Sequence, residues 1–548
     1  MPISSRRKAV AVVASGVAVS AVATTLYAPA SGLDLNLGIL PIDLSLSLGG
    51  RPDIKVAEIG RLTGLGAEIV AYDKRNDHAW VTDAIKNEVG IVDLADPTHP
   101  MLIKTVSLAR YGFTVTSVAI SGKHVVVGTR PARPGVPGDA SGSFARGTAV
   151  LMDLEGNVTD TETVGFGPDA VTFAPDGGQV LIANEGEPQN YQPGSADPNG
   201  SVSILKVKRG QFDGNREVVF TALTAADLSA GVRIASPAPT IAQDLEPEYI
   251  AVTDDSRRAF VSLQENNAVA EINLATGRVA AIRPAGTVDH SKAAFALDAS
   301  DEDGPGETPS LSIRTFPELF GMRMPDGVAT FQSLGRTYYV TANEGDQREY
   351  AGLTGGADSR RLKDIPAGEL PTAWGASATD LRKDGNLGRL TVTRALPWIP
   401  GGPIYTYGSR SFSIFDDAGT LVYDSGNAFE QITSTQVATL FNSELGKVGE
   451  FDKRSDNKGP EPEGVAVEQV FGRQLAVITL ERTGGIMVFD FTDPQRPSLI
   501  TYLPGDAGNP APEGVQFIEQ GAKTLILVAS EGDGTAPGAL TVYQIRRG

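Results

Sequence analysis

The chain has 548 residues, no cysteine and a formal net charge of −19, from 66 acidic and 47 basic side chains. A surface this acidic repels nucleic acid and anionic lipid and attracts cations, so we expect no nucleic-acid partner. The absence of cysteine excludes a disulfide framework, and with only four histidines it argues against a zinc or blue-copper centre. A chain of this length divides its core among domains or repeats.

The N-terminus, residues 1–30, is typical of a secretory signal. Residues 6–8 are basic, residues 9–27 are mainly apolar, and Ala28-Pro29-Ala30 fits a small-x-small cleavage site. The arginine pair also fits a twin-arginine signal, and an uncleaved membrane anchor is the alternative. No later run is apolar and long enough to span a bilayer. We expect a secreted monomer with no membrane span in its mature chain and with a linker, or an edge strand, at 31–53.

Apolar runs separated by turn residues recur from residue 54 onward with little helical periodicity, which predicts an all-β fold. A lone strand at 54–62 comes first. Two distant segments, 88–108 and 485–503, share the pattern apolar-x-Asp-apolar-x-Asp-Pro-x-x-Pro-x-Leu-Ile. These segments supply the third and fourth strands of a four-stranded repeat.

Five copies of one layout carry paired acidic side chains: Pro, an acid, an apolar run, a polar turn, a second apolar run and then Glu. The two acids are 16, 17, 18, 18 and 18 residues apart in the successive copies, and this regular spacing indicates a structural repeat. The pairs are Asp169/Glu185, Glu248/Glu265, Asp326/Glu344, Glu463/Glu481 and Glu513/Glu531.

Four-stranded repeats arranged radially form β-propellers. Repeat starts near residues 67, 115, 169, 248, 326, 463 and 513 predict a seven-bladed β-propeller over 54–548. The last repeat stops after its third strand, so we expect the strand at 54–62 to complete that blade and close the ring. Loop insertions on one face are predicted at 275–325, 346–409 and 425–460, the last with a short helix at 433–441.

The acid pairs should surround one mouth of the propeller, because the first strand of a blade starts where the second strand ends. Crowded carboxylates repel one another unless a cation neutralises them, and Ca²⁺ accepts hard oxygen ligands in irregular geometry. The alternative is that each acid caps backbone N–H groups of a neighbouring blade. The predicted Ca²⁺ ligands are Glu185, Glu248, Glu265, Asp326, Glu344, Glu463, Glu481, Glu513 and Glu531.

Arginines near these glutamates could hold a phosphate group beside a bound metal, with surface ion pairs as the alternative. The phosphate-binding candidates are Arg348 and Arg482, and the second insertion adds Arg360 and Arg361. The acidic loop at 297–304 resembles a calcium loop but fails the EF-hand spacing, so a solvated loop is the other interpretation. His290 precedes this loop and could serve a hydrolytic triad or only a loop hydrogen bond.

Several longer motifs resemble the choice-of-anchor I family, which includes mesenchyme-specific cell-surface glycoproteins and many bacterial exported proteins. They are ANEGEPQNY with DPNGSVSI (183–204), AQDLEPEYIAV with LQENNAVAEIN (242–273), DHSKAAFALDASDEDG (289–304), PDGVATF with TANEGDQREY (325–350) and GSRSFSIFD (408–416). The resemblance covers nearly the whole mature chain. It implies a YVTN/WD40-like propeller, export and a cell-surface or extracellular location. Some members carry an alkaline-phosphatase label, and some relatives are linked to calcium biomineral deposition.

Two functions are therefore expected. The first is an exported, Ca²⁺-binding propeller that hydrolyses small phosphorylated molecules with the help of its metal. The alternative is a non-enzymatic module that binds cations, glycans, protein or another extracellular polymer. Bacterial members often end in a surface anchor, whereas this chain stops at Gly548 after its last repeat, so we expect release rather than anchoring.

Overall fold

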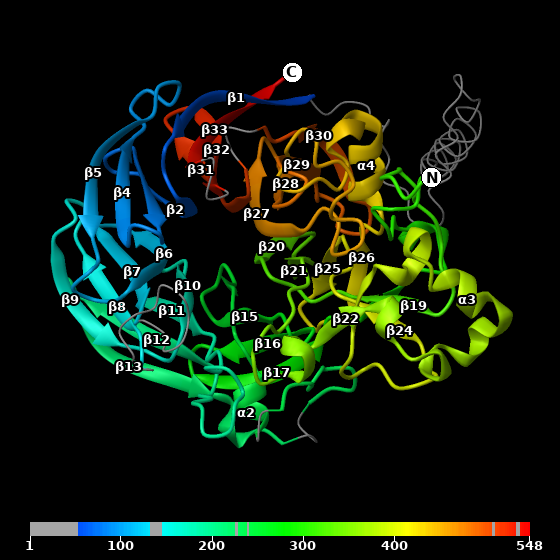
Figure 1. Ribbon diagram of the computed structural model, residues 1–548. Coiled ribbons are helices and arrows are strands. Elements are labelled where there is room, and N and C mark those ends of the chain that lie inside the picture. The colour runs from blue at the N-terminus through cyan, green and yellow to red at the C-terminus, as the bar shows by residue number, and fades with distance from the viewer. Residues whose placement is uncertain (1–52, 132–144, 225–227, 238–239, 507–509, 533–536) are drawn as a thin grey trace, which may run out of the picture. The chain divides into compact units, whose positions relative to one another are not determined.

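The computed structural model describes residues 53–548 except 132–144, 225–227, 238–239, 507–509 and 533–536. The predicted signal and nearly all of the predicted linker lie outside these residues. Within the described part of the chain, no helix is both long and apolar enough to cross a bilayer. The strands form seven four-stranded antiparallel sheets arranged around a ring, and one five-stranded sheet (Figure 1). The predicted seven-bladed β-propeller is therefore confirmed.

Each blade uses four strands in order from the centre of the ring outward. Blades one to three are β2–β5 (Ala67–Asp73, His78–Asp83, Glu88–Asp93, Met101–Ser107), β6–β9 (Thr114–Ser121, His124–Arg130, Thr148–Met152, Val158–Thr163) and β10–β13 (Pro168–Phe173, Gln179–Asn184, Ser201–Lys208, Gln211–Val219). Blade four is β14–β17 (Ile250–Val252, Arg258–Leu263, Ala268–Asn273, Arg278–Pro284). Blade five is β20, β21, β25 and β26 (Val328–Ser333, Arg336–Ala342, Phe412–Asp416, Leu421–Asp424).

Blade six is β27–β30 (Pro462–Val470, Arg473–Leu480, Ile486–Asp490, Ser498–Leu503). Blade seven combines both ends of the described chain: β31 (Pro512–Gln520), β32 (Lys523–Gly532), β33 (Pro537–Arg547) and β1 (Ile54–Thr63). β1 pairs antiparallel with β33 along its whole length, as predicted for the closing strand. The innermost strands contact one another in the cyclic order β2, β6, β10, β14, β20, β27, β31 and back to β2, which closes the ring.

The core lies between the blades rather than at one centre. An apolar cluster fills each interface between neighbouring sheets, from blades one and two round to blades seven and one. Blade one, for example, packs β2, β3 and β4 residues against blade seven, and its other face packs Trp80 and Ile91 against blade two. Each sheet is therefore covered on both faces, which explains the near-continuous apolar runs of the second and third strands.

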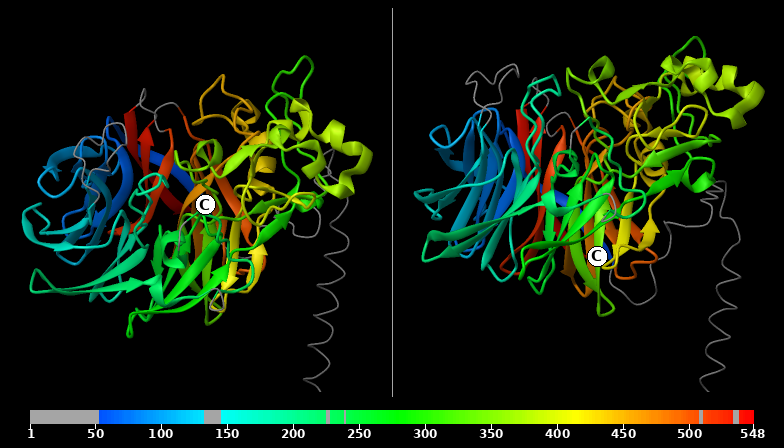
Figure 2. Two further views of the ribbon diagram at one scale, coloured as in Figure 1. Left: turned by 60° about the horizontal axis from the view of Figure 1, so that its bottom comes forward. Right: turned by 90° about the horizontal axis from the view of Figure 1, so that it is seen from below.

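The insertions build a second layer beside blades four to six. Their five-stranded sheet has the order β18 (Thr287–Asp289), β19 (Leu319–Met322), β24 (Ile404–Thr406), β23 (Thr391–Thr393) and β22 (Ser359–Arg361). The helix α3 (Ala378–Leu381) packs against this sheet. The helix α2 (Ile241–Asp244) packs against blades three and four, and α4 (Ala428–Gln436) packs against blades five and six. The views in Figure 2 show α3 and its neighbouring turns projecting on the same side of the ring as the other long loops.

Two predicted boundaries were wrong. The insertion placed at 275–325 starts too early, because β17 at 278–284 is the fourth strand of blade four. Its arginines hid a strand whose side chains are mostly only half buried. The helix placed at 433–441 is α4 at 428–436, followed by a single 3₁₀ turn. Its buried residues, among them Phe429 and Ile432, lie largely before the predicted start, so packing rather than the Ser/Thr-rich run sets the helix.

Candidate functional site

The paired acids of each repeat lie side by side because of the strand register. Pro168, Pro462 and Pro512 pair with Asn184, Leu480 and Ser530, the residues just before the glutamates that end the second strands. The acid after each proline and the glutamate after each second strand therefore reach the same end of the blade. The predicted arrangement of five acid pairs at one mouth agrees with this register.

A glycine after the acid brings neighbouring blades together at this mouth. A Cβ atom on Gly327 would lie 2.2 Å from the Glu463 carbonyl oxygen, and one on Gly464 would lie 2.0 Å from that of Glu513. The same contact recurs between Gly514 and the carbonyl of Glu68, at 2.4 Å. Only glycine permits this approach, so the Pro-acid-Gly motif of blades five to seven packs inner strands and draws their carboxylates together.

A central cavity of about 240 Å³ is the result of this packing. Carboxylates from five blades line it, and Arg130 of blade two and Tyr249 of blade four are also among its lining residues. The lining acids are Glu68, Asp169, Asp326, Glu463 and Glu513. Burial first, and then repulsion among the acids, raise the pKa of Glu68 to about 8 and the pKa of Asp326 well above its ordinary value. The cavity would therefore hold protons or bind cations.

Glu463, Glu481 and Glu513 form one of two carboxylate clusters found among the described residues. One oxygen from each lies within 4.8 Å of the others. The Oε2 atom of Glu463 is buried and has no hydrogen-bond partner. Burial, followed by repulsion from neighbouring acids, raises the pKa of Glu463 and of Glu513 well above the ordinary range. Three such oxygens fit a single ion at Ca²⁺–oxygen distances of about 2.4 Å.

The second cluster joins Glu344, Glu461 and Glu481, and it contains its own cation. Lys458 Nζ lies 2.5 Å from Glu344 and 3.0 Å from Glu461. Arg454 pairs with Glu461 as well, at 2.5 Å. Burial opposes ionisation of Glu461, but Lys458, Arg454 and Arg482 outweigh it and lower its pKa to about 2. This cluster is therefore charge-balanced by the protein, and both oxygens of Glu344 are occupied, by Lys458 and Gln264.

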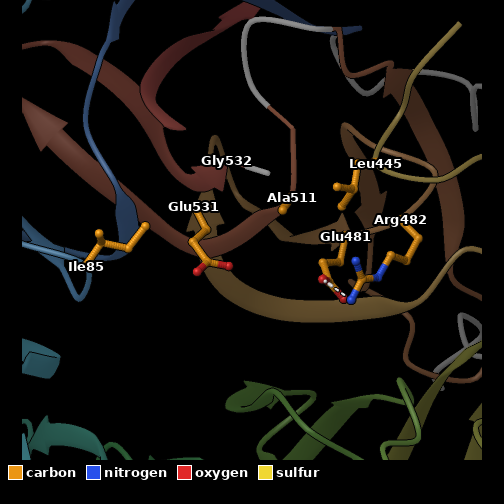
Figure 3. A pocket seen from close by; sticks show the side chains of 7 residues that line it. All are labelled: Ile85, Leu445, Glu481, Arg482, Ala511, Glu531 and Gly532. Carbon is orange, nitrogen blue, oxygen red and sulfur yellow. Dashed lines mark ion pairs between the residues drawn. The ribbon is translucent and has the colours of Figure 1, made fainter. Parts of the chain in front are cut away.

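A second cavity of about 250 Å³ opens beside the cluster of Glu463, Glu481 and Glu513. Figure 3 shows Glu481 and Glu531, from neighbouring blades, between Ile85 at one end of this cavity and Leu445 at the other. Arg482 also lines this cavity and pairs with Glu481 at 3.0 Å. Glu481 therefore belongs both to this cavity and to the cluster.

The remaining predicted ligands lie under the loops of blades three to five. Glu248 and Glu265 are buried and Glu185 is half-buried, and loss of contact with water is the main cause of their raised pKa values, about 7 for Glu265. The Oε2 atoms of Glu248 and Glu265 have no hydrogen-bond partner. These three acids do not join either of the close clusters found in the described part of the chain.

The two phosphate-binding candidates are engaged by carboxylates. Arg348 is 2% exposed, pairs with the equally buried Glu246 at 3.1 Å and donates to the Asp244 carbonyl at 2.9 Å. Arg482 spans Glu481 and Glu444, both at 3.0 Å. Ion pairing is therefore the role that the structure gives both side chains, and Arg348 is in the interior rather than on the surface.

Loops from blades three and five meet above this acidic region. Gly352 N–H donates to the Asn190 carbonyl at 2.7 Å, and the rings of Tyr191 and Tyr350 pack edge to face with centroids 5.2 Å apart. Tyr350 also donates to Glu187, which pairs with Arg130 of blade two. The loops therefore connect blades two, three and five across the mouth.

The other two candidates from the sequence are structural. Asp298, Ser300 and Asp301 are buried, so the acidic loop is not solvated; Asp298 accepts a hydrogen bond from the Ser312 N–H, and Asp301 pairs with Arg389 at 2.6 Å. His290 is 2% exposed, and its Nδ1 lies 2.6 Å from the Phe295 carbonyl oxygen. Its alternative role, a loop hydrogen bond, is the one observed.

A family model, the Choice-of-anchor I domain, matches residues 68–494. The chain belongs to the choice-of-anchor I family. Gigasin-3a of Magallana gigas is 34% identical over 119 residues, or 20% of this chain and 42% of that protein. The mesenchyme-specific cell surface glycoprotein of Strongylocentrotus purpuratus is 26% identical over 291 residues, or 47% of this chain and 36% of that protein. The match thus spans less than half the length of either relative.

Among solved structures, Kuenenia stuttgartiensis hydrazine synthase is similar to this choice-of-anchor I protein, with a TM-score of 0.43 and 12% identity. That match covers 85% of this chain and 93% of the hydrazine synthase chain. The expected family is confirmed by the family model. The relationship to a cell-surface glycoprotein agrees with the expected class of protein, while an activity is not shown by these comparisons.

Sequence reasoning missed the acids that hold the buried cations. Glu246 and Glu461 stand immediately before the repeat proline, in the tripeptide Glu-Pro-Glu of blades four and six. One binds Arg348 and the other binds Lys458. An acid on both sides of that proline was the available signal, whereas nothing near Lys458 in the sequence marks it as a buried cation.

Proposed function

We propose that this choice-of-anchor I propeller is a Ca²⁺-binding extracellular module whose cation site is formed by Glu463, Glu481 and Glu513. The observation that carries the proposal is the approach of one carboxylate oxygen from each of the three residues to within 4.8 Å of the others. The buried Oε2 atom of Glu463 also has no hydrogen-bond partner. A divalent cation would remove the repulsion that raises the pKa values of these acids.

The choice of Ca²⁺ follows from the ligand chemistry. The available ligands are carboxylate oxygens from three strand ends of two blades, which suits a hard cation that tolerates irregular geometry better than Mg²⁺ does. Additional acids of the central cavity, Asp326 and Glu68, lie near enough to Glu463 and Glu513 respectively to raise their pKa values. They would add negative charge around the ion.

The proposed partner is an anionic extracellular polymer that reaches the ion through the cavity shown in Figure 3. Carboxylate or sulfate groups of such a polymer could complete the coordination of Ca²⁺. The extracellular location is supported by the predicted signal and by the similarity to the Strongylocentrotus purpuratus protein, which is named as a cell surface glycoprotein.

Phosphoester hydrolysis of a small phosphorylated molecule is the second candidate, supported by the metal-ligand cluster and by Arg482 beside it. The pairing of Arg482 with Glu444 and Glu481 favours the binding module, because these carboxylates already engage both terminal nitrogens that would hold a phosphate. Arg348, the other candidate, is buried with Glu246.

The test is calorimetric titration of EDTA-treated mature protein with Ca²⁺ and with Mg²⁺, together with thermal unfolding. We expect saturable Ca²⁺ binding and a stabilisation of about 2.7 kcal/mol at a hundredfold excess of Ca²⁺ over Kd. The variant Glu463→Gln/Glu513→Gln should weaken binding at least about tenfold, because two of three charged ligands are lost. Glu468→Gln, an exposed acid on the same strand β27, is the matched control.

Equal Ca²⁺ affinity in the double variant and the control would contradict the proposed site. Hydrolysis of p-nitrophenyl phosphate, followed in the same samples, separates the two functions. Turnover that requires Ca²⁺ and is lost in the double variant would establish the hydrolase, and Ca²⁺ binding without turnover would favour the module.

A further inference from the structure

The strongest feature outside the acidic mouth is a pair of side chains in the second insertion that offer hydrogen-bond donors without acceptors. The guanidinium carbon of Arg360 lies 4.1 Å from the ring centroid of Trp398. The Nε and Nη2 atoms of Arg360 and the Nε1 atom of Trp398 are all buried, and none has a hydrogen-bond partner. Three unpaired donors on two touching side chains are costly, because each has lost its hydrogen bonds to water without gaining a partner in the protein.

The neighbouring arginine on the same strand, Arg361, has hydrogen-bond acceptors for its donors. Its Nη1 atom lies 3.0 Å from an Asp456 carboxylate oxygen and also donates to the Asp456 carbonyl at 2.8 Å. Successive residues of β22 point to opposite faces of the sheet, so Arg360 faces a different environment.

A second positive charge lies beside Arg360. Burial, and then the nearby Arg394, lower the pKa of Arg360 below its ordinary value, and the charges of Glu369 and Asp364 oppose this shift only in part. Arg394 donates to the backbone carbonyls of Ser359 at 2.8 Å and Thr354 at 2.5 Å, so its charge is not neutralised by those contacts. Two arginines and an indole N–H thus create a local positive potential within an acidic protein.

The rim of this feature is apolar and exposed. Leu396 and Ile399, on either side of the Pro397–Trp398 pair, are 55% and 56% exposed. The Leu396 carbonyl accepts a hydrogen bond from Arg233 at 2.8 Å, which ties the segment to the loop before blade four. An anionic group attached to a less polar body would satisfy the donors and cover this rim.

We propose that Arg360, Arg394 and Trp398 form a binding site for an oxyanion, namely a sulfate, phosphate or carboxylate group. The planar guanidinium of Arg360 supplies two donors suited to two oxygens of one such group, and Trp398 supplies the third. Stacking on the indole holds the guanidinium in place. The group belongs either to a free ion or to an extracellular anionic polymer, and the site is independent of the proposed Ca²⁺ cluster.

Tryptophan fluorescence gives a direct test, because the chain has only three tryptophans. Trp80 is fully buried and Trp374, which is 4% exposed, already donates its N–H to the Pro317 carbonyl. Sodium sulfate, sodium phosphate and dextran sulfate would each be titrated in EDTA at constant ionic strength, with calorimetry as the second readout. We expect a saturable fluorescence change that comes from Trp398 and is absent in Trp398→Phe.

Arg360→Gln should reduce anion affinity at least about tenfold, because it removes the charge and the two-donor fork. Arg360→Lys keeps the charge but lacks the two-donor fork, so its anion affinity should lie between those of the wild type and Arg360→Gln. This variant still tests the site if Arg360→Gln folds poorly. Arg257→Gln, at an exposed arginine of blade four, is the control with unchanged binding.

Saturable binding of inorganic sulfate or phosphate would identify a site for the free ion, and binding of dextran sulfate alone would identify the polymer as the source. Absence of binding by all three probes would overturn the proposal, and so would equal binding by wild type and Arg360→Gln. Because all samples contain EDTA, neither outcome depends on the proposed Ca²⁺ site.

Discussion

Lys458 Nζ lies 2.5 Å from Glu344 Oε1, so a lysine from the third insertion neutralises an acid predicted to bind Ca²⁺. The same ammonium is 3.2 Å from Asp346 and 3.0 Å from Glu461. Burial opposes its charge, but the surrounding acids outweigh burial and raise the pKa of Lys458 well above its ordinary value. Two neighbouring carboxylate clusters therefore share Glu481, and only one of them contains a lysine.

Removing this lysine should convert its cluster into a second cation site. We expect Lys458→Met to destabilise the Ca²⁺-free protein by about 3–5 kcal/mol, because buried acids lose their partner. Added Ca²⁺ should recover most of the loss, and calorimetry should find one more bound ion than in the wild type. Lys383→Met is the control, since Lys383 is 67% exposed in its pair with Asp380. An unchanged ion count in Lys458→Met would contradict this view of the cluster.

Arg348 provides a second test of buried charge. Its side chain and that of Glu246 are each 1% exposed, so Arg348→Met should cost about 3–5 kcal/mol of unfolding free energy by leaving Glu246 unpaired. Arg348→Met/Glu246→Gln should recover a large part of this loss, because the uncompensated charge is gone. Urea unfolding of the two single variants and the double variant measures the coupling. A role in phosphate binding alone would instead leave the stability of Arg348→Met unchanged.

The fold could be predicted from the sequence because one repeat specifies both the strands within a blade and the arrangement of the blades. The spacing of the acid pairs fixed the first two strands of five blades, and the observed register places Pro462 opposite Leu480 as that spacing requires. The last repeat has no fourth strand of its own, so the strand at 54–62 was predicted to complete it, and this strand pairs with β33. The pattern is periodic because each blade packs against its neighbours in the same way, so every copy needs the same apolar and turn positions.

The site was only partly predictable because its charges are balanced by residues distant in sequence. Lys458 meets Glu344 across 114 residues, and Arg348 meets Glu246 across 102. No periodic pattern marks these partners, since both cations come from insertions that have no counterpart in the other blades. The sequence therefore predicted where the carboxylates gather. It did not predict which of them the cations of the insertions neutralise, because that depends on how the insertions pack against the blades.

His290 should make stability depend on pH in the acidic range. Burial is the main cause that lowers the pKa of His290 from 6.5 to about 4. The charge of Arg410 also lowers this pKa, whereas the charges of Asp289 and Asp424 raise it by less. Between pH 6.5 and 4 the unfolded chain binds a proton that the folded protein does not. Stability is therefore lost as pH falls through this window, by up to about 3 kcal/mol from this residue.

The measurement compares wild type with His290→Asn, whose side-chain amide can still donate to the Phe295 carbonyl, as Nδ1 is placed to do. Urea unfolding from pH 7 down to 4 should show the difference in unfolding free energy shifting in favour of the variant, since other titrating groups cancel. A constant difference across the window would show that His290 gains a proton in the folded protein as readily as in the unfolded chain.

Deleting β1 should open the ring at blade seven. β1 pairs with β33 from Ile54–Arg547 to Thr63–Ala539, and Ile54, Val56, Ile59 and Leu62 pack against the clusters on the two faces of that blade. Loss of four half-buried apolar side chains costs about 5 kcal/mol and exposes the β33 edge to pairing with other chains. We expect a chain that starts at residue 64 to unfold at lower urea concentration and to associate.

A chain that starts at residue 53 is the matched control, because it retains β1 and should remain monomeric. Size-exclusion chromatography with light scattering gives the association state, and urea unfolding gives the stability. A synthetic peptide of residues 53–63 should restore both properties when added to the shortened chain, since it can rebuild the missing edge. If the shortened chain is monomeric and equally stable without the peptide, β33 does not need its partner and ring closure does not contribute to stability.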